Sequence, residues 1–141
     1  MSYSKAIVTV VLSTLILPIA ATGCTAADAP VINEVVSTQT AYRMIQNNQE
    51  NPSFVIIDVR TQEEFNAGHI AKARMVDYES QDFNAKINES DRNKKYLVYC
   101  RTARRSGLAV KVMKDLGFRE VYDMAKGINQ WKAEGLPIVV N

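Results

Sequence analysis

Cysteine and histidine are scarce in this chain, which has two cysteines and a single histidine among its 141 residues. Because protein metal sites combine several such ligands, His69 alone makes no metal site, and no Cys–His or Ser–His–Asp relay can be assembled around it. A structural disulfide needs two cysteines, and Cys24 lies at the end of a signal-like segment. Cys100 is then left without a partner, which argues for a functional thiol.

An excess of charge of one sign is also lacking, because 17 Lys and Arg residues oppose 15 Asp and Glu residues, for a net charge of +2. The basic residues are dispersed and no aromatic platform interleaves with them, so we expect no nucleic-acid partner. The chain contains no internal repeat and no low-complexity tract. Its length fits one compact domain behind the N-terminal segment.

The first residues have the pattern of an export signal, with Lys5 followed by an uncharged, mostly apolar run at 6–23. The favoured cleavage is a bacterial lipobox, ATGC, which makes residues 1–23 a lipoprotein signal peptide and Cys24 the lipidated N-terminus. The alternative is an ordinary signal peptidase site that ends near residue 27. Both predict an exported, periplasmic protein, and the lipobox adds a membrane anchor with the outer membrane as the default destination.

The remainder divides into a tether at 24–34, which is small, polar and proline-containing, and a domain at 35–141. Apolar, β-branched runs typical of buried strands occupy 54–59, 96–100 and 119–124. They alternate with segments of helical spacing or with helix-capping residues, which begin near Ser37, Thr61, Arg105 and Ile128. This alternation predicts an α/β sandwich with a mostly parallel central sheet.

The run CRTARR, Cys100–Arg105, follows one of these strands and precedes a helix. Unpaired backbone amides and the positive end of the helix dipole favour an anion at such a position. Three arginines in the run add positive charge, and cysteines of low pKa are typically found in such surroundings. The pattern therefore predicts a reactive thiolate at Cys100 in preference to a buried core cysteine.

The length of the loop separates two kinds of chemistry. In phosphatases built on a cysteine loop, an arginine follows the cysteine after five residues, and Ser106 occupies that position here. Arg105 comes after four residues, so the loop is one residue short for phosphate. A smaller loop suits a single sulfur atom, because its backbone N–H groups can hold a persulfide anion.

Five segments, in order and in spacing, resemble the rhodanese family: IDVR at 57–60, EEF at 63–65, GHI at 68–70, VYCRTARRS at 98–106 and GINQWKAEGLPI at 127–138. They span nearly all of residues 35–140. The resemblance implies a single-domain, three-layer α/β sandwich of the rhodanese-like type. It also implies that neither a metal nor an organic cofactor is needed.

By this resemblance, Cys100 is the catalytic nucleophile, which accepts sulfane sulfur as a persulfide. The resemblance assigns the substrate-binding loop to the five residues Arg101, Thr102, Ala103, Arg104 and Arg105. The last of them matches the arginine that closes the loop, and the other two arginines are candidates for holding an anionic donor such as thiosulfate.

Asp58 and Arg60 match the family's DVR motif, and we expect them to form a supporting ion pair at a strand end close to the loop. Two departures from the family pattern concern turns. Ala103 stands where many members have Gly, so a positive φ there would be strained. Residues 71–73, AKA, stand where the family usually has Pro-Gly-Ala, which puts the turn at that point in question.

The sequence thus predicts a thiosulfate sulfurtransferase-like enzyme that transfers sulfane sulfur from a small anionic donor, such as thiosulfate, to a thiol or cyanide. One alternative is a non-catalytic sulfur carrier or protein-binding module that keeps the loop. A phosphatase or arsenate reductase is a weaker alternative, because the loop is short.

Overall fold

The computed structural model describes residues 31–140. The predicted signal peptide and Cys24 lie outside the described residues, as does the tether up to residue 30. The first strand, β1 (Ile32–Val36), begins inside the stretch that the sequence pattern assigned to the tether. It forms an edge of the sheet and is only partly buried, so its residues lack the continuous apolar character of the inner strands. None of the helices within 31–140 is long and apolar enough to cross a membrane.

Five parallel strands form one sheet in the order β1-β5-β4-β2-β3, which confirms the predicted α/β class with a central sheet that is parallel throughout. After β1 the elements are α1 (Thr38–Asn47), β2 (Phe54–Asp58), α2 (Gln62–Asn66), β3 (Arg74–Met75), α3 (Phe83–Asn88), β4 (Lys95–Tyr99), α4 (Arg104–Asp115), β5 (Glu120–Met124) and α5 (Gly127–Ala133).

Helix starts follow the capping residues that the sequence offers. The Ser37 hydroxyl accepts a hydrogen bond from the Thr40 N–H at 3.1 Å, and α1 begins at the next residue after Ser37. Thr61 and Glu64 form the predicted capping box at the start of α2, each side chain accepting a hydrogen bond from the other's backbone N–H. Local chemistry therefore set these two boundaries.

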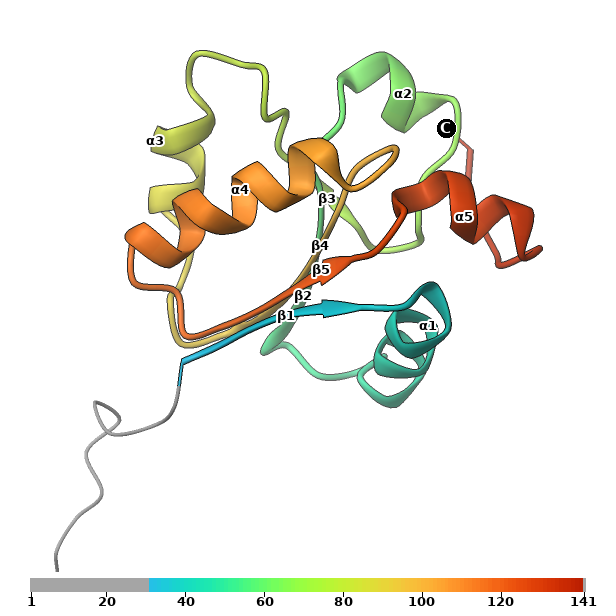
Figure 1. Ribbon diagram of the computed structural model, residues 1–141, viewed down its shortest axis with the longest axis horizontal. Helices are drawn as coiled ribbons and strands as arrows, with labels where there is room; N and C mark the ends of the chain where they lie inside the picture. The colour runs from blue at the N-terminus through green and yellow to red at the C-terminus, as the bar shows by residue number, and fades with distance from the viewer. Residues whose placement is uncertain (1–30, 141) are drawn as a thin grey trace, which may run out of the picture.

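The sheet separates two apolar cores, and Figure 1 shows α3 and α4 on the side opposite to α1. One core packs α3 and α4 on the sheet through residues that include Ile87, Val98, Met113 and Phe118. The other packs α1 and α5 through Ala41, Leu97, Ile128 and Trp131. Neighbouring residues of β4 alternate between the two cores, as strand geometry requires. Such two-sided cover leaves the carboxyl ends of the strands as the place for a ligand.

The turn at residues 70–73 forms despite its departure from the family pattern. The Ala73 N–H donates to the Ile70 carbonyl at 3.1 Å, and Lys72 takes a left-handed φ of 63°. This conformation costs a non-glycine residue about 1–2 kcal/mol. Lys72 Nζ donates to the Gln49 carbonyl at 2.7 Å, a contact that glycine cannot make and that offsets part of the cost.

Candidate active site

Cys100 directly follows β4 and lies at the carboxyl end of the sheet, where the loop to α4 begins. The residue is 1% exposed, yet it forms part of the wall of a pocket of about 260 Å³. The other lining residues are Glu64, Glu79, Arg101, Thr102, Arg104 and Arg105. The structure thus brings the predicted cysteine and four of the five predicted loop residues to one small, polar pocket.

The loop presents its backbone amides toward no acceptor within the described part of the chain. None of the N–H groups of residues 101–106 donates there, and the first that does is that of Gly107, to the Ala103 carbonyl at 3.1 Å. Ala103 precedes α4 with a left-handed φ of 76°. Many family members have glycine at this position, and the alanine here adopts the strained conformation that the sequence analysis considered. The turn and the free amides at the helix start make a site suited to an anion.

Helix α5 is hydrogen-bonded to the loop, a contact that was not predicted from the sequence. The Ile128 N–H donates to the Cys100 carbonyl at 2.9 Å, and the Asn129 N–H donates to the Arg101 carbonyl at 3.2 Å. Gly127, with a φ of 60°, permits this approach, because a Cβ there would lie 2.4 Å from the Cys100 carbonyl oxygen. In the sequence, a glycine at the start of a helix is the one feature that could have indicated this close approach.

The arginines of the loop are not equivalent. Arg105 is bound by the Glu64 carboxylate at 2.7 and 2.8 Å and lies 3.6 Å from Glu79. Arg104 is largely exposed and lies 4.0 Å from Glu79, and Arg101 is exposed. Glu64 thus neutralises Arg105, and Glu79 lies near two of the arginines; the loop residues alone did not indicate either contact.

The Glu64–Arg105 pair alters the titration of both partners. Burial raises the pKa of Glu64, but the hydrogen bonds from Arg105 and Thr61 and the charges of Arg105 and Arg60 outweigh it, so the pKa lies below its ordinary value. For Arg105, burial lowers the pKa, while Glu64, Glu79 and Cys100 raise it to a net increase. Both groups are therefore ionised at neutral pH, and Arg105 lies within electrostatic reach of the thiol.

Two buried polar residues were not among the predicted site residues: Ser106, beside Cys100, and Asp123, on the strand next to β4. Ser106 is fully buried, and its hydroxyl lies 3.6 Å from Cys100 Sγ, within hydrogen-bond reach of a sulfur atom. Asp123, from β5, is 6% exposed. Burial raises its pKa to about 6, opposed by a hydrogen bond with Ser106.

Asp58 and Arg60 form the predicted ion pair, at the end of β2. The Arg60 guanidinium donates to both carboxylate oxygens of Asp58, the shortest distance being 2.6 Å, and also to the Gly68 carbonyl at 2.9 Å. Arg60 also lies over the Tyr99 ring, 5.7 Å from its centroid. This cluster supports the strand that delivers Cys100, and it is not part of the pocket wall.

His69 has a structural position. Its ring stacks on Phe65 with 3.6 Å between centroids, and Nδ1 lies 2.9 Å from the Phe65 carbonyl. Within residues 31–140 no group of three or more His, Cys, Asp or Glu side chains is arranged to hold a metal ion.

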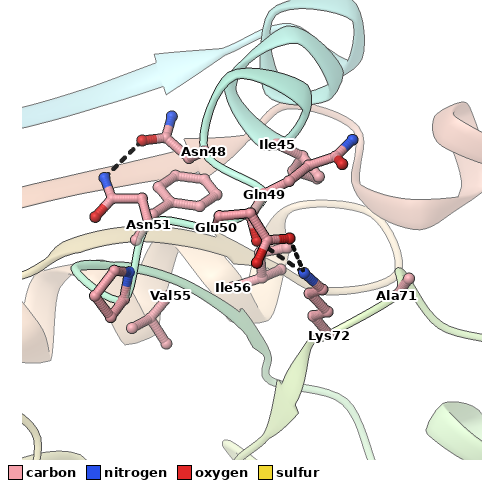
Figure 2. A pocket seen from close by; sticks show the side chains of 11 residues that line it. Ile45, Asn48, Gln49, Glu50, Asn51, Val55, Ile56, Ala71 and Lys72 are labelled. Atoms are coloured by element: carbon pink, nitrogen blue, oxygen red, sulfur yellow. Dashed lines mark hydrogen bonds and ion pairs between the residues drawn. The ribbon is translucent and has the colours of Figure 1, made fainter.

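A larger pocket, of about 470 Å³, lies away from Cys100, between the end of α1, the start of β2 and the turn at Lys72. Figure 2 shows Lys72 reaching toward Gln49 and Glu50 at its rim, and Asn48 bonded to Asn51. Its lining is mostly apolar and amide, with no nucleophile, so the chemistry belongs to the smaller pocket.

Comparison with known proteins gives a consistent result. The family model described as a rhodanese-like domain matches residues 38–134. The thiosulfate sulfurtransferase GlpE of Coxiella burnetii is 35% identical over 80 residues, which are 56% of this chain and 72% of that protein. The putative sulfur carrier protein YrkF of Bacillus subtilis is 30% identical over 86 residues, 61% of this chain and 45% of that protein.

Solved structures agree with the sequence relatives. A rhodanese-related protein from Thermoplasma volcanium superposes with a TM-score of 0.66 at 28% identity, covering 77% of this chain and 99% of that one. The match spans 45% to 59% of the length of three of the curated relatives.

Proposed function

The chain belongs to the rhodanese-like domain family, and on that premise we propose that it is a sulfurtransferase in which Cys100 carries sulfane sulfur as a persulfide. Relatives named as sulfurtransferase or sulfur carrier support this reading. The observation that carries the proposal is the position of Cys100 in the wall of a small pocket, beside backbone amides that have no partner within residues 31–140.

In the first half-reaction, the Cys100 thiolate attacks the outer sulfur of a donor such as thiosulfate. A sulfur–sulfur bond forms to Cys100, the bond within thiosulfate breaks, and sulfite leaves with the electron pair. The Cys100 persulfide then carries one negative charge on its outer sulfur. The free amides of residues 101–106 and the positive start of α4 are suited to stabilise that charge.

In the second half-reaction, a thiol or cyanide attacks the outer sulfur of the persulfide. Cyanide leaves as thiocyanate, a thiolate leaves as its own persulfide, and Cys100 returns to the thiolate. Arg101 and Arg104, the two exposed cations at the mouth of the pocket, are placed to attract an anionic donor.

Intact mass spectrometry after incubation with thiosulfate tests the chemistry directly. We expect a gain of one sulfur atom, lost again on addition of cyanide. Because the full chain has a second cysteine, Cys24→Ser is the matched control and should still gain sulfur, whereas Cys100→Ser should not. A gain of sulfur in Cys100→Ser would contradict the assignment of the nucleophile.

A sulfur carrier is the second candidate, and the similarity to the putative sulfur carrier YrkF favours it. A carrier would accept sulfur on Cys100 but release it slowly to cyanide or small thiols. Steady-state turnover with thiosulfate and cyanide separates the two, because an enzyme releases many equivalents of thiocyanate and a carrier about one. The phosphatase or arsenate reductase alternative predicts hydrolysis of an aryl phosphate, or reduction of arsenate, and the short loop disfavours both.

We also propose that the chain is exported and anchored through a lipid on Cys24, with the domain in the periplasm and a tether that runs from Cys24 to the start of β1 at Ile32. The proposal rests on the signal-like pattern of the first 24 residues. Association with membranes should survive high salt and be lost in Cys24→Ala, since several acyl chains anchor stably. A soluble wild-type protein that begins near Asp28 would instead support the ordinary signal peptidase.

A further inference from the structure

Asp123 is a buried carboxyl group for which the sulfur-transfer steps above have no role. It is 6% exposed, and its Oδ1 has no hydrogen-bond partner within residues 31–140. An ionised carboxylate that is buried and only partly hydrogen-bonded is unfavourable, so protein structures rarely retain one without a reason. Its other oxygen, Oδ2, lies 3.5 Å from the position that a Cβ on Gly107 would take, which places it against the first turn of α4.

Ser106 joins this carboxyl group to the nucleophile. Its hydroxyl lies 3.6 Å from Cys100 Sγ. Asp123 Oδ2 lies against the next residue, Gly107, and Ser106 lowers the pKa of Asp123, so the hydroxyl lies close to both groups. A hydroxyl has one proton to donate and two lone pairs that accept. It can therefore donate to the sulfur while it accepts from a protonated Asp123, or donate to an ionised Asp123 while it accepts from the thiol.

No charged side chain of the neighbouring strands faces Asp123 within the described residues. β4 places Val98 beside it, β1 places the uncharged Val35, and α4 places Ser106 and Gly107. Arg105, the preceding residue of α4, is turned to Glu64 and Glu79. Accordingly, burial and not a charged neighbour raises the pKa of Asp123 to about 6.

We propose that Asp123 is a positioning residue that takes up the proton lost by Cys100, through the hydroxyl of Ser106. The thiol proton passes to Ser106 Oγ while the Ser106 hydroxyl proton passes to Asp123 Oδ2. The negative charge moves from the carboxylate to the sulfur, and the total charge does not change. The inference rests on the proposed sulfur transfer for its purpose, but the proton shift itself needs no sulfur donor.

The shared proton has a consequence for the pH dependence of the thiol. Once the pair has lost one proton, a fixed fraction of molecules holds the thiolate with a protonated Asp123. This fraction does not change with pH until the second proton leaves. Cys100 should thus show an intermediate plateau of reactivity, in addition to the rise at its own ionisation.

The rate of alkylation of Cys100 by iodoacetamide as a function of pH tests this, in full-length Cys24→Ser so that one thiol reacts. We expect two inflections, the lower near pH 6, with a plateau between them. Asp123→Asn should show a single inflection, below which the rate falls tenfold per pH unit. Ser106→Ala retains Asp123 but removes the hydroxyl that donates to the sulfur, so it should lower the plateau. Asp115→Asn, which removes an exposed carboxylate of α4, is the matched control and should keep it.

Two outcomes would overturn the inference: a single inflection in the parent, or an unchanged plateau in folded Asp123→Asn. If Asp123→Asn does not fold, ¹³C NMR titration of the Asp123 carboxyl gives the same information in the parent and in Cys100→Ala. We expect two steps in the parent and one in Cys100→Ala, and identical curves would count against the proton link. A plateau without persulfide formation would refute the sulfurtransferase proposal alone, and persulfide without a plateau would refute this inference alone.

Discussion

Two arginine–carboxylate pairs lie near the carboxyl end of the sheet, and they differ in burial and in sequence separation. Asp58 and Arg60 are two residues apart, and their side chains are 0% and 4% exposed. Glu64 and Arg105 are 41 residues apart, with side chains 26% and 11% exposed at the pocket wall. The first pair is part of the scaffold beneath the site, while the second sets the charge that a ligand meets.

The difference follows from what surrounds each cation. Arg60 is held on three sides, by the Asp58 carboxylate, the Gly68 carbonyl and the Tyr99 ring, so it has no freedom to meet a ligand. Within the described residues, Arg105 is hydrogen-bonded to Glu64 and lies near Glu79 at a surface pocket, where solvent or an anion can compete. The same pair of groups, a guanidinium and a carboxylate, thus stabilises the fold at one position and sets the charge of the pocket at the other.

The largest expected effect comes from breaking the buried pair. Asp58→Asn leaves the Arg60 charge buried without its counter-ion, which should lower the free energy of unfolding by about 3–5 kcal/mol. Denaturant unfolding measures the loss. The double variant Asp58→Asn, Arg60→Met removes both charges and should cost less than the single one. A loss below about 1 kcal/mol in Asp58→Asn would mean that the pair does not act as a scaffold.

Breaking the exposed pair should change ligand binding more than folding. Glu64→Gln keeps the capping box but removes the charge that neutralises Arg105, so an anionic donor should bind more tightly. We expect the KM for thiosulfate to fall about five-fold, the equivalent of about 1 kcal/mol for one charge near the surface. Glu63→Gln, an exposed neighbour in the same helix, is the control. An equal fall in both variants would show a general effect of net charge.

The stability effect of Glu64→Gln should be smaller and should depend on pH. The folded pKa of Glu64 is depressed, so its stabilising contribution is present above the unfolded value near 4.5 and is lost as pH falls through the folded pKa. At neutral pH we expect Glu64→Gln to unfold more easily by no more than about 1 kcal/mol. The difference from wild type should vanish in acid. If the difference in the free energy of unfolding is constant with pH, it comes from packing and not from the charge of Glu64.

The smallest effect on the free energy of unfolding is expected from a backbone change in the loop that contains Arg105. This change leaves both ion pairs in place. Ala103→Gly relieves the left-handed φ of 76° and should stabilise the fold by about 0.5 kcal/mol after the entropy of glycine is subtracted. Ala85→Gly, at an exposed position in α3, should instead destabilise it by about 0.5–1 kcal/mol. Thermal unfolding of both variants gives the comparison, and a loss in Ala103→Gly would show that the loop is not strained.

Much of the fold could be predicted from the sequence, because the signals were local. The apolar run at 54–59 and the caps at Ser37 and Thr61 depend on residues a few positions apart, and the structure confirmed a strand at 54–58 and both caps. The first three residues of the edge strand β1 were predicted as part of the tether, because an edge strand that is only partly buried lacks a continuous apolar pattern.

The candidate site divides in the same way. The sequence by itself determined that Cys100 follows a strand, opens a helix and is accompanied by arginines, since these are neighbours in the chain. Only the tertiary structure decided that Glu64 neutralises Arg105, that Gly127 lets α5 bind the loop, and that Asp123 is buried against the first turn of α4. Each of these contacts joins separate elements, and the order of strands in the sheet, which no local pattern encodes, determines which elements meet.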